Sequence, residues 1–182
     1  MGILDKLKDW FNAPRIDNPE SVNMHEAEEA MEQAALTEAP TERNRRLAYE
    51  LTVAAFFKLW DGKDAPSEAF GPQSPALIQE FMQTFKPGWR WGAYNAADLA
   101  DHPEDLAPFF FPVPVGSPLQ MGDIVVFKAD YMHPFGNVGI VANPDTSYGS
   151  VTVFTQHVTQ GALRAQESLT ISAVFRRNHV ID

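Results

Sequence analysis

The side chains available for chemistry are limited, because the chain contains five histidines and no cysteine. Without cysteine there is no thiol nucleophile, no disulfide and no thiolate ligand for a metal. No two histidines have a spacing typical of a zinc site, so we expect no metal and no cofactor. A nucleophile must then be a hydroxyl with a base beside it, because a hydroxyl is not ionised near neutral pH.

One serine lies where a helix is predicted to begin. Ser74 is followed by Pro75 and by an apolar helical pattern that continues to about Phe85. Serine is among the best N-cap residues, and proline is favoured at the first helical position. We therefore expect the Ser74 hydroxyl to accept a hydrogen bond from a backbone N–H of this helix. A hydroxyl used as a cap is not free to attack a substrate.

Two groups of apolar side chains have patterns that suit binding. An aromatic loop contains Trp89, Trp91 and Tyr94. These rings are predicted either to line a groove for a sugar or peptide, together with Gln156 from a later strand, or to pack over the helix. Near the N-terminus, a helical stripe is predicted either to dock onto a partner protein or to pack on its own domain, through Leu4, Leu7, Trp10 and Phe11.

The order of the elements predicts the fold class. Helical patterns cover residues 3–11, 20–38, 41–60 and 75–85, with a short helical turn at 95–100. Strand-like runs separated by turn signals follow at 124–128, 138–142, 150–158 and 169–177. Helices followed by an antiparallel meander indicate the α+β class. We divide the chain into a helical extension, residues 1–62, and a second domain, residues 63–182.

Charge and hydropathy exclude several classes of partner. The 182 residues carry a formal net charge of −10, whereas binding to nucleic acid requires a basic patch. No apolar run reaches the roughly 18 residues that a membrane-spanning helix needs. Charged residues interrupt the apolar residues near the N-terminus, so we expect no signal peptide and synthesis in the cytoplasm.

Motifs in the second half of the chain resemble a known family. Residues 118–127 read Pro-Leu-Gln-Met-Gly-Asp-Ile-Val-Val-Phe, and residues 136–141 read Gly-Asn-Val-Gly-Ile-Val. These two motifs resemble the centre of CHAP and NlpC/P60 type domains, which are papain-like cysteine amidases and peptidases. The resemblance covers residues 71–178. It implies a papain-like fold in which an N-terminal helix precedes an antiparallel sheet of about four or more strands.

The resemblance also implies where a catalytic site would lie. In the family, a cysteine at a helix N-terminus attacks a peptidoglycan amide, a histidine takes its proton, and a third residue orients the histidine. The matching positions here carry Ser74, Asn137 and Thr155, and an asparagine amide does not accept a proton near neutral pH. Losing the nucleophile or base of such a triad costs roughly 10⁶-fold in turnover. We therefore expect a catalytically degenerate domain that is not an enzyme.

Three functions follow from these expectations. The first is a non-catalytic structural or interaction module, a bacteriophage virion component that binds capsid or tail proteins; the virion location rests on the habit of the family. The second is a module that binds peptidoglycan without cutting it. The third is an active peptidoglycan hydrolase, in which His157 or His133 forms a rewired pair with Ser74, or in which Ser74 is an engineered cysteine replacement. Engineering would not explain Asn137 and Thr155.

Overall fold

The computed structural model describes residues 42–67, 71, 73–92, 94–131, 133–146, 149–157, 161–168 and 170–180. The chain divides into two units, Met1–Pro40 and Thr41–Asp182. The helices expected at 3–11 and 20–38 lie outside the described residues, and so do the docking residues Leu4, Leu7, Trp10 and Phe11.

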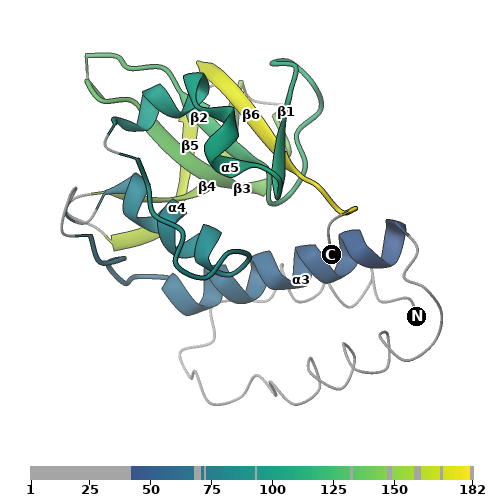
Figure 1. Cartoon of the computed structure of the whole chain (residues 1–182). Coiled ribbons are helices and arrows are strands. Elements are labelled where there is room, and N and C mark those ends of the chain that lie inside the picture. The colour runs from purple at the N-terminus through teal and green to yellow at the C-terminus, as the bar shows by residue number, and fades with distance from the viewer. Residues whose placement is uncertain are drawn as a thin grey trace. The chain divides into compact units, whose positions relative to one another are not determined.

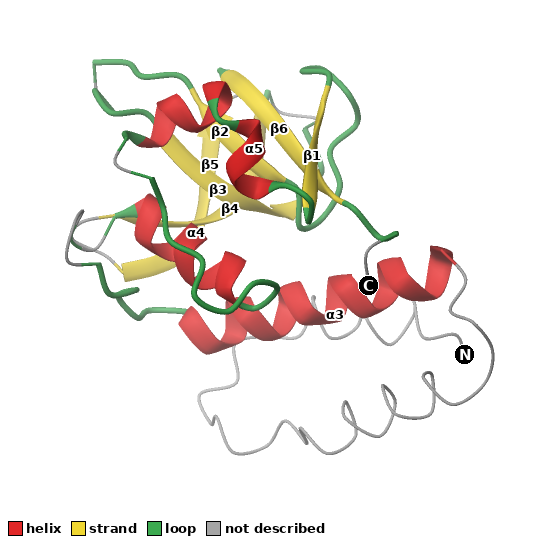
Figure 2. Cartoon of the chain, in the orientation of Figure 1, coloured by secondary structure: helices red, strands yellow, loops and turns green. Residues whose placement is uncertain are grey.

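The described elements form an α+β fold, as predicted (Figures 1 and 2). The helices are α3 (Glu42–Trp60), α4 (Ser74–Gln83), the 3-10 helix η1 (Ala96–Asp101) and α5 (Pro103–Leu106). The strands are β1 (Phe110–Val113), β2 (Ile124–Phe127), β3 (Asn137–Asn143), β4 (Ser150–His157), β5 (Gly161–Ser168) and β6 (Ile171–Arg177). All neighbouring strands are antiparallel, in the order β1-β6-β2-β3-β4-β5. Strands β1 and β5 are additional to the four predicted runs.

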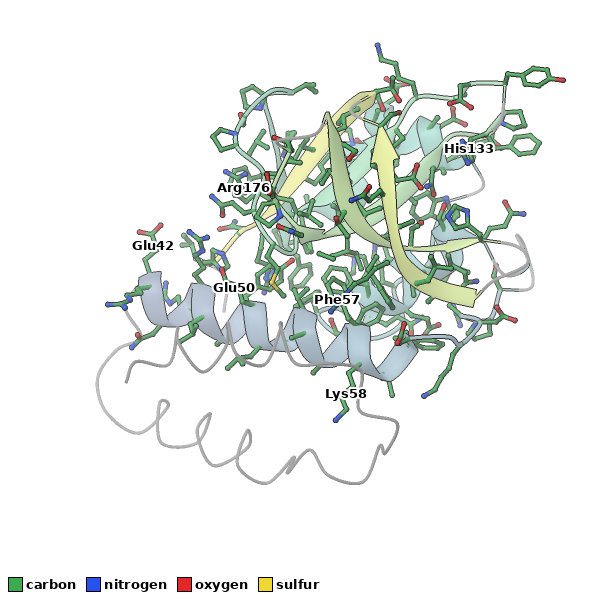
Figure 3. All side chains as sticks on the ribbon, turned by 180° about the vertical axis from the view of Figure 1, so that it is seen from behind. Glu42, Glu50, Phe57, Lys58, His133 and Arg176 are labelled. Atoms are coloured by element: carbon green, nitrogen blue, oxygen red, sulfur yellow. The ribbon has the colours of Figure 1, made fainter. Side chains whose placement is uncertain are left out.

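Helix α3 shares its core with the sheet. The ring of Phe56 lies 5.0 Å from that of Phe81 on α4, and the ring of Phe57 lies 4.6 Å from that of Phe154 on β4. Figure 3 shows Phe57 pointing from α3 toward the sheet and Lys58 pointing away. The helix therefore belongs to the Thr41–Asp182 unit, whereas the sequence division at residue 62 had assigned it to the extension.

Both faces of the central strand β2 are buried. Ile124 and Val126 contribute to the main core under the helices, whereas Val125 and Phe127 belong to a second cluster on the other face. The second cluster is completed by Val141, Val151, Val153 and Val174. A strand buried on both faces requires a continuous apolar run, which explains the Ile-Val-Val-Phe sequence of β2.

The β4–β5 hairpin bends sharply. Glu167 is paired in register with Val151, near the start of β4, yet its carboxylate lies 3.8 Å from His157 Nε2 at the other end of that strand. A straight strand of eight residues would span about 25 Å. The contact therefore requires a strong bend, which is visible in the two yellow-green strands of Figure 3.

An ion pair between the half-buried Arg176 and the buried Asp123 fixes the entry into β2. Arg176 donates to both carboxylate oxygens of Asp123, from Nε to Oδ1 at 3.1 Å and from Nη2 to Oδ2 at 2.8 Å. The backbone N–H of Gln120 donates to the same Oδ2 at 2.9 Å. Bidentate arginine–carboxylate pairs are strong and directional. Figure 3 shows Arg176 well away from His133, so this ion pair supports the fold and lies outside the site described below.

Candidate functional site

The Ser74 hydroxyl does not cap its own helix. Gln73 is the N-cap residue of α4, so Ser74 is the first helical residue. Its Oγ accepts a hydrogen bond of 3.4 Å from the backbone N–H of Val138 on β3. The predicted cap is therefore wrong by one position. Among the described residues, no histidine nitrogen lies within hydrogen-bonding distance of this hydroxyl.

The structure brings together the three residues that match the family's catalytic positions. Asn137 Oδ1 accepts from the Val138 N–H at 2.9 Å and from the Thr155 hydroxyl at 3.1 Å. That hydroxyl also lies 2.8 Å from the Val138 carbonyl oxygen, and its single hydrogen serves one acceptor at a time. The Val138 N–H thus links Ser74 to Asn137. All three side chains are buried and hydrogen-bonded.

A carboxylate that the sequence analysis missed completes this cluster. Asn137 Nδ2 donates to Glu167 Oε1 at 3.0 Å. The residues of β5 alternate, so that Glu167 lies on the same half-buried face as Leu163 and Ala165. A carboxylate on the inner face of a strand costs free energy unless it has partners. An acidic residue on the half-buried side of an alternating strand therefore indicates a carboxylate with partners. The sequence predicts no strand over residues 161–168, so Glu167 is not among the predicted site residues.

Both histidines proposed as alternative bases lie beside this cluster. His157 ends β4, and its Nε2 is 3.8 Å from Glu167 Oε1. His133, labelled in Figure 3, lies on the loop between β2 and β3, with its ring centre 6.3 Å from that of His157. Asp130 holds His133 in place, accepting from its backbone N–H at 2.7 Å. Only His157, of these two, has a contact with the carboxylate of the cluster.

The two tryptophans expected to line a groove are core residues. Trp89 and Trp91 are 5% and 7% exposed. The Trp89 indole N–H donates to the Asp105 carbonyl at 2.9 Å, and that of Trp91 to the Tyr94 carbonyl at 3.0 Å. With buried rings and bonded N–H groups, neither can stack on a ligand in this arrangement. Their alternative role, packing over the helix, agrees with their burial and with the hydrogen bond of 3.1 Å from the Trp91 backbone N–H to Gln79 Oε1 on α4.

Gln156 is also unsuited to the binding role predicted for it. Its side-chain oxygen accepts from the Ala65 N–H at 2.7 Å, and its Nε2 donates to the Ala65 carbonyl at 3.4 Å. Gln156 is 2% exposed. The amide therefore ties the segment after α3 to β4, and it presents no polar group to a ligand.

Tyr94 is the least buried of the predicted groove residues. Its hydroxyl donates to Asp105 Oδ2 at 2.6 Å, and its ring stacks on that of His102 with 4.5 Å between ring centres. Burial raises the pKa of Tyr94 well above the ordinary tyrosine value, and the hydrogen bond to Asp105 raises it further. The nearby charges of Asp105, Glu104 and Asp98 act in the same direction.

Two further properties of the described residues bear on the site. Across the parts of the chain that the structure describes, no cluster of three or more histidine and acidic side chains is arranged to hold a metal ion. Within the same residues, every helix is too short or too polar to cross a membrane.

Solved structures of two proteins have a similar fold. The endolysin LysIME-EF1 superposes with a TM-score of 0.59 and 22% identity, covering 70% of this chain and 63% of the endolysin chain. Ly7917 gives a TM-score of 0.53 and 18% identity, covering 71% of this chain and 62% of that one. Ly7917 with the hydrolyzing product of MDP gives 0.53 and 17%, covering 70% and 62%. The chain thus spans less than two thirds of these proteins.

Comparisons of sequence give no match to a family profile and none to a curated protein. The structural likeness nevertheless contradicts our expectation that the chain is not an enzyme. One protein that shares the fold is an endolysin, and the other was solved with a hydrolyzing product. On these matches the expectation is wrong.

Proposed function

We propose that the chain hydrolyses an amide bond of bacterial peptidoglycan, with Ser74 as its nucleophile. The observation that carries the proposal is the position of this hydroxyl. On a fold shared with an endolysin, it lies at the N-terminus of α4, is not the N-cap residue of that helix, and bonds to β3. Endolysins degrade peptidoglycan, and the family that residues 71–178 resemble cleaves amides of the same polymer.

In the proposed reaction, Ser74 Oγ attacks the carbonyl carbon of the amide while its proton passes to His157. The carbon–nitrogen bond then breaks, and the amine leaves with that proton. Water hydrolyses the resulting ester of Ser74, again with His157 as the base. The positive end of α4 stabilises the oxyanion that forms next to it. The mechanism requires His157 to approach Ser74 when substrate binds, because catalytic hydrogen bonds often tighten only in the complex.

The test is the release of free amino groups from purified peptidoglycan. We expect release by the full-length protein and a loss of roughly 10³-fold or more in Ser74→Ala, in line with the removal of other catalytic nucleophiles. Ser74→Cys should retain activity, because a helix N-terminus favours the thiolate. Ser168→Ala is the matched control, since Ser168 is exposed on β5 and its hydroxyl pairs with that of Thr170 at 3.0 Å.

Two outcomes would reject the proposal. One is equal release by the wild-type protein and Ser74→Ala, which would show that another group is responsible. The other is no release by the wild-type protein where LysIME-EF1 digests the same material. Retention on insoluble cell walls without release would then leave binding of peptidoglycan as the function.

The place where the chain acts stays a prediction. From the family resemblance we expect it in bacteriophage particles, in contact with other virion proteins. Mass spectrometry of purified particles tests this location independently of the hydrolysis assay. Absence of the chain from the particles would reject the virion location and leave the proposed reaction untouched.

A further inference from the structure

We propose that Glu167 is the positioning residue of this site. Its carboxylate lies within ion-pair distance of His157 Nε2, at 3.8 Å, and accepts a hydrogen bond from Asn137 Nδ2 at 3.0 Å. The kinetic part of this inference rests on the proposed function, whereas the structural part does not. The family resemblance does not point to this residue.

The fold places Glu167 where a carboxylate is otherwise unfavourable. It lies on the half-buried face of β5, and its side chain is 15% exposed. A carboxylate taken out of water requires partners that restore its hydrogen bonds. The bend of the β4–β5 hairpin supplies them, because it carries Glu167 from its register partner Val151 to Asn137 and His157.

The proximity of the Glu167 carboxylate to His157 favours one form of the imidazole. Glu167 Oε1 lies 3.8 Å from Nε2, within ion-pair distance. A carboxylate beside one ring nitrogen favours the tautomer with the proton on that nitrogen. In His157 the proton is then on Nε2, which leaves Nδ1 as the nitrogen that can accept a proton. Without Glu167 the ring has no partner that imposes this choice among the contacts described for it.

The side-chain amide of Asn137 cannot replace His157 as the proton acceptor, because its own hydrogen bonds occupy it. Its Nδ2 is bonded to Glu167 at 3.0 Å, and its Oδ1 accepts from Val138 and Thr155. The amide is 4% exposed, and both of its ends are engaged. Glu167 therefore orients the buried amide and the accessible imidazole through one oxygen atom, and the imidazole is the partner that can reach substrate.

The direct test is ¹⁵N NMR of the His157 imidazole in the full-length protein. In the wild-type protein we expect the shifts of a ring protonated on Nε2, and in Glu167→Ala we expect the two ring nitrogens to approach each other in shift. Glu167→Gln should show a smaller change in the same direction, since its amide oxygen can still accept. Gln166→Ala, an exposed neighbour on β5, is the control and should match the wild-type protein. Identical His157 shifts in the wild-type protein and Glu167→Ala would overturn the proposal.

Circular dichroism and urea unfolding establish that each variant is folded. If Glu167→Ala does not fold, the His157 shifts of Glu167→Gln decide instead. This variant keeps a side-chain oxygen that accepts the hydrogen bond from Asn137. Unchanged His157 shifts in a folded Glu167→Gln would then overturn the proposal.

The kinetic test separates positioning from binding. Glu167→Gln should lower kcat for peptidoglycan roughly 10²- to 10⁴-fold with little change in KM, as the loss of an orienting carboxylate does in other triads. The double variant His157→Ala/Glu167→Gln should be no slower than His157→Ala, because Glu167 acts through His157. A raised KM with unchanged kcat would overturn the positioning role. If the wild-type protein releases nothing, the proposed function fails, and the NMR result still decides the role of Glu167.

Discussion

The hydroxyl of Tyr49 on α3 donates a hydrogen bond of 2.6 Å to the carbonyl oxygen of Gly122, in the turn before β2. The ring lies so close to the turn that a β-carbon on Gly122 would stand 2.5 Å from Tyr49 Cε1. Gly122 also has φ +86°, a conformation that side chains other than glycine rarely adopt. One residue thus meets two constraints, one from its own backbone and one from α3.

We therefore expect Gly122→Ala to lower the free energy of unfolding by about 2–4 kcal/mol, the sum of backbone strain and overpacking. Gly116→Ala is the control, because Gly116 has φ +94° and its added β-carbon would meet nothing within 4 Å. The control should lose only about 1 kcal/mol. Urea unfolding measures both. Equal losses would show that the contact with Tyr49 contributes nothing.

Removing Arg176 should destabilise the fold through the charge left behind. Asp123 is 2% exposed, so Arg176→Ala leaves a buried carboxylate without its ionic partner, at a cost of about 3 kcal/mol. Arg176→Lys should recover only part of this, because lysine cannot form the bidentate pair. As a control, Arg46→Ala removes an exposed pair with Glu50 and should change the free energy of unfolding by less than about 0.5 kcal/mol. Similar losses in Arg176→Ala and Arg46→Ala would contradict the structural role of the buried pair.

Tyr94 should make the fold sensitive to alkaline pH. Its pKa is raised in the folded protein, first by burial and then by the hydrogen bond to Asp105. Below about pH 10 the residue is neutral in both states, and its stabilising contribution is complete. At higher pH it ionises in the unfolded chain but stays neutral in the folded one, so the free energy of unfolding falls.

The measurement for Tyr94 is urea unfolding at about pH 8 and about pH 11. Tyr94→Phe should lose less stability between these values than the wild-type protein, because it has no hydroxyl to ionise. The difference in free energy of unfolding between Tyr94→Phe and the wild-type protein at the lower pH measures the loss of the Asp105 hydrogen bond alone. An identical fall in both proteins would show that Tyr94 ionises equally in the folded and unfolded states.

Gln156 should prove to be a structural residue. Gln156→Ala leaves the N–H and carbonyl of Ala65 without their side-chain partner and opens a cavity, at a cost of about 2–4 kcal/mol. Retention on cell walls by the protein that remains folded should be unchanged. Gln166→Ala, on the exposed face of β5, should change neither quantity. Weaker retention in Gln156→Ala without loss of stability would restore a binding role.

The pattern of apolar residues was enough to predict four of the strands but not the other two. Strand β1 contains Pro112, which discourages a strand assignment, but β1 lies at the edge of the sheet, where proline is tolerated. Strand β5 has only Ala162, Leu163 and Ala165 as apolar side chains, so its alternation is weak. Its place depends on pairing with β4 and on contacts made by the bend, which are not encoded in local sequence.

The site was predictable where motifs fix positions along the chain and unpredictable where tertiary contacts decide. The family resemblance alone pointed to Ser74, Asn137 and Thr155, which the structure brings into one cluster. The Ser74 cap failed because Gln73 occupies the cap position and β3 offers Ser74 another partner. The tryptophans are predicted to line a groove because their rings could stack on a ligand, whereas the fold buries both rings and bonds their N–H groups to backbone carbonyls. The amide of Gln156 is likewise bonded to the backbone of Ala65, which is distant in the chain.

The shared core of α3 and the sheet sets a limit on how the second unit can be transplanted into a fusion protein. A fragment cut at residue 63 would leave behind Val53, Phe56 and Phe57, and the rings of Phe81 and Phe154 would face solvent. Such a fragment would expose apolar surface and would tend to aggregate. A fragment for use in a fusion protein has to begin before Glu42, so that it includes the whole of α3 together with the strands that α3 packs against.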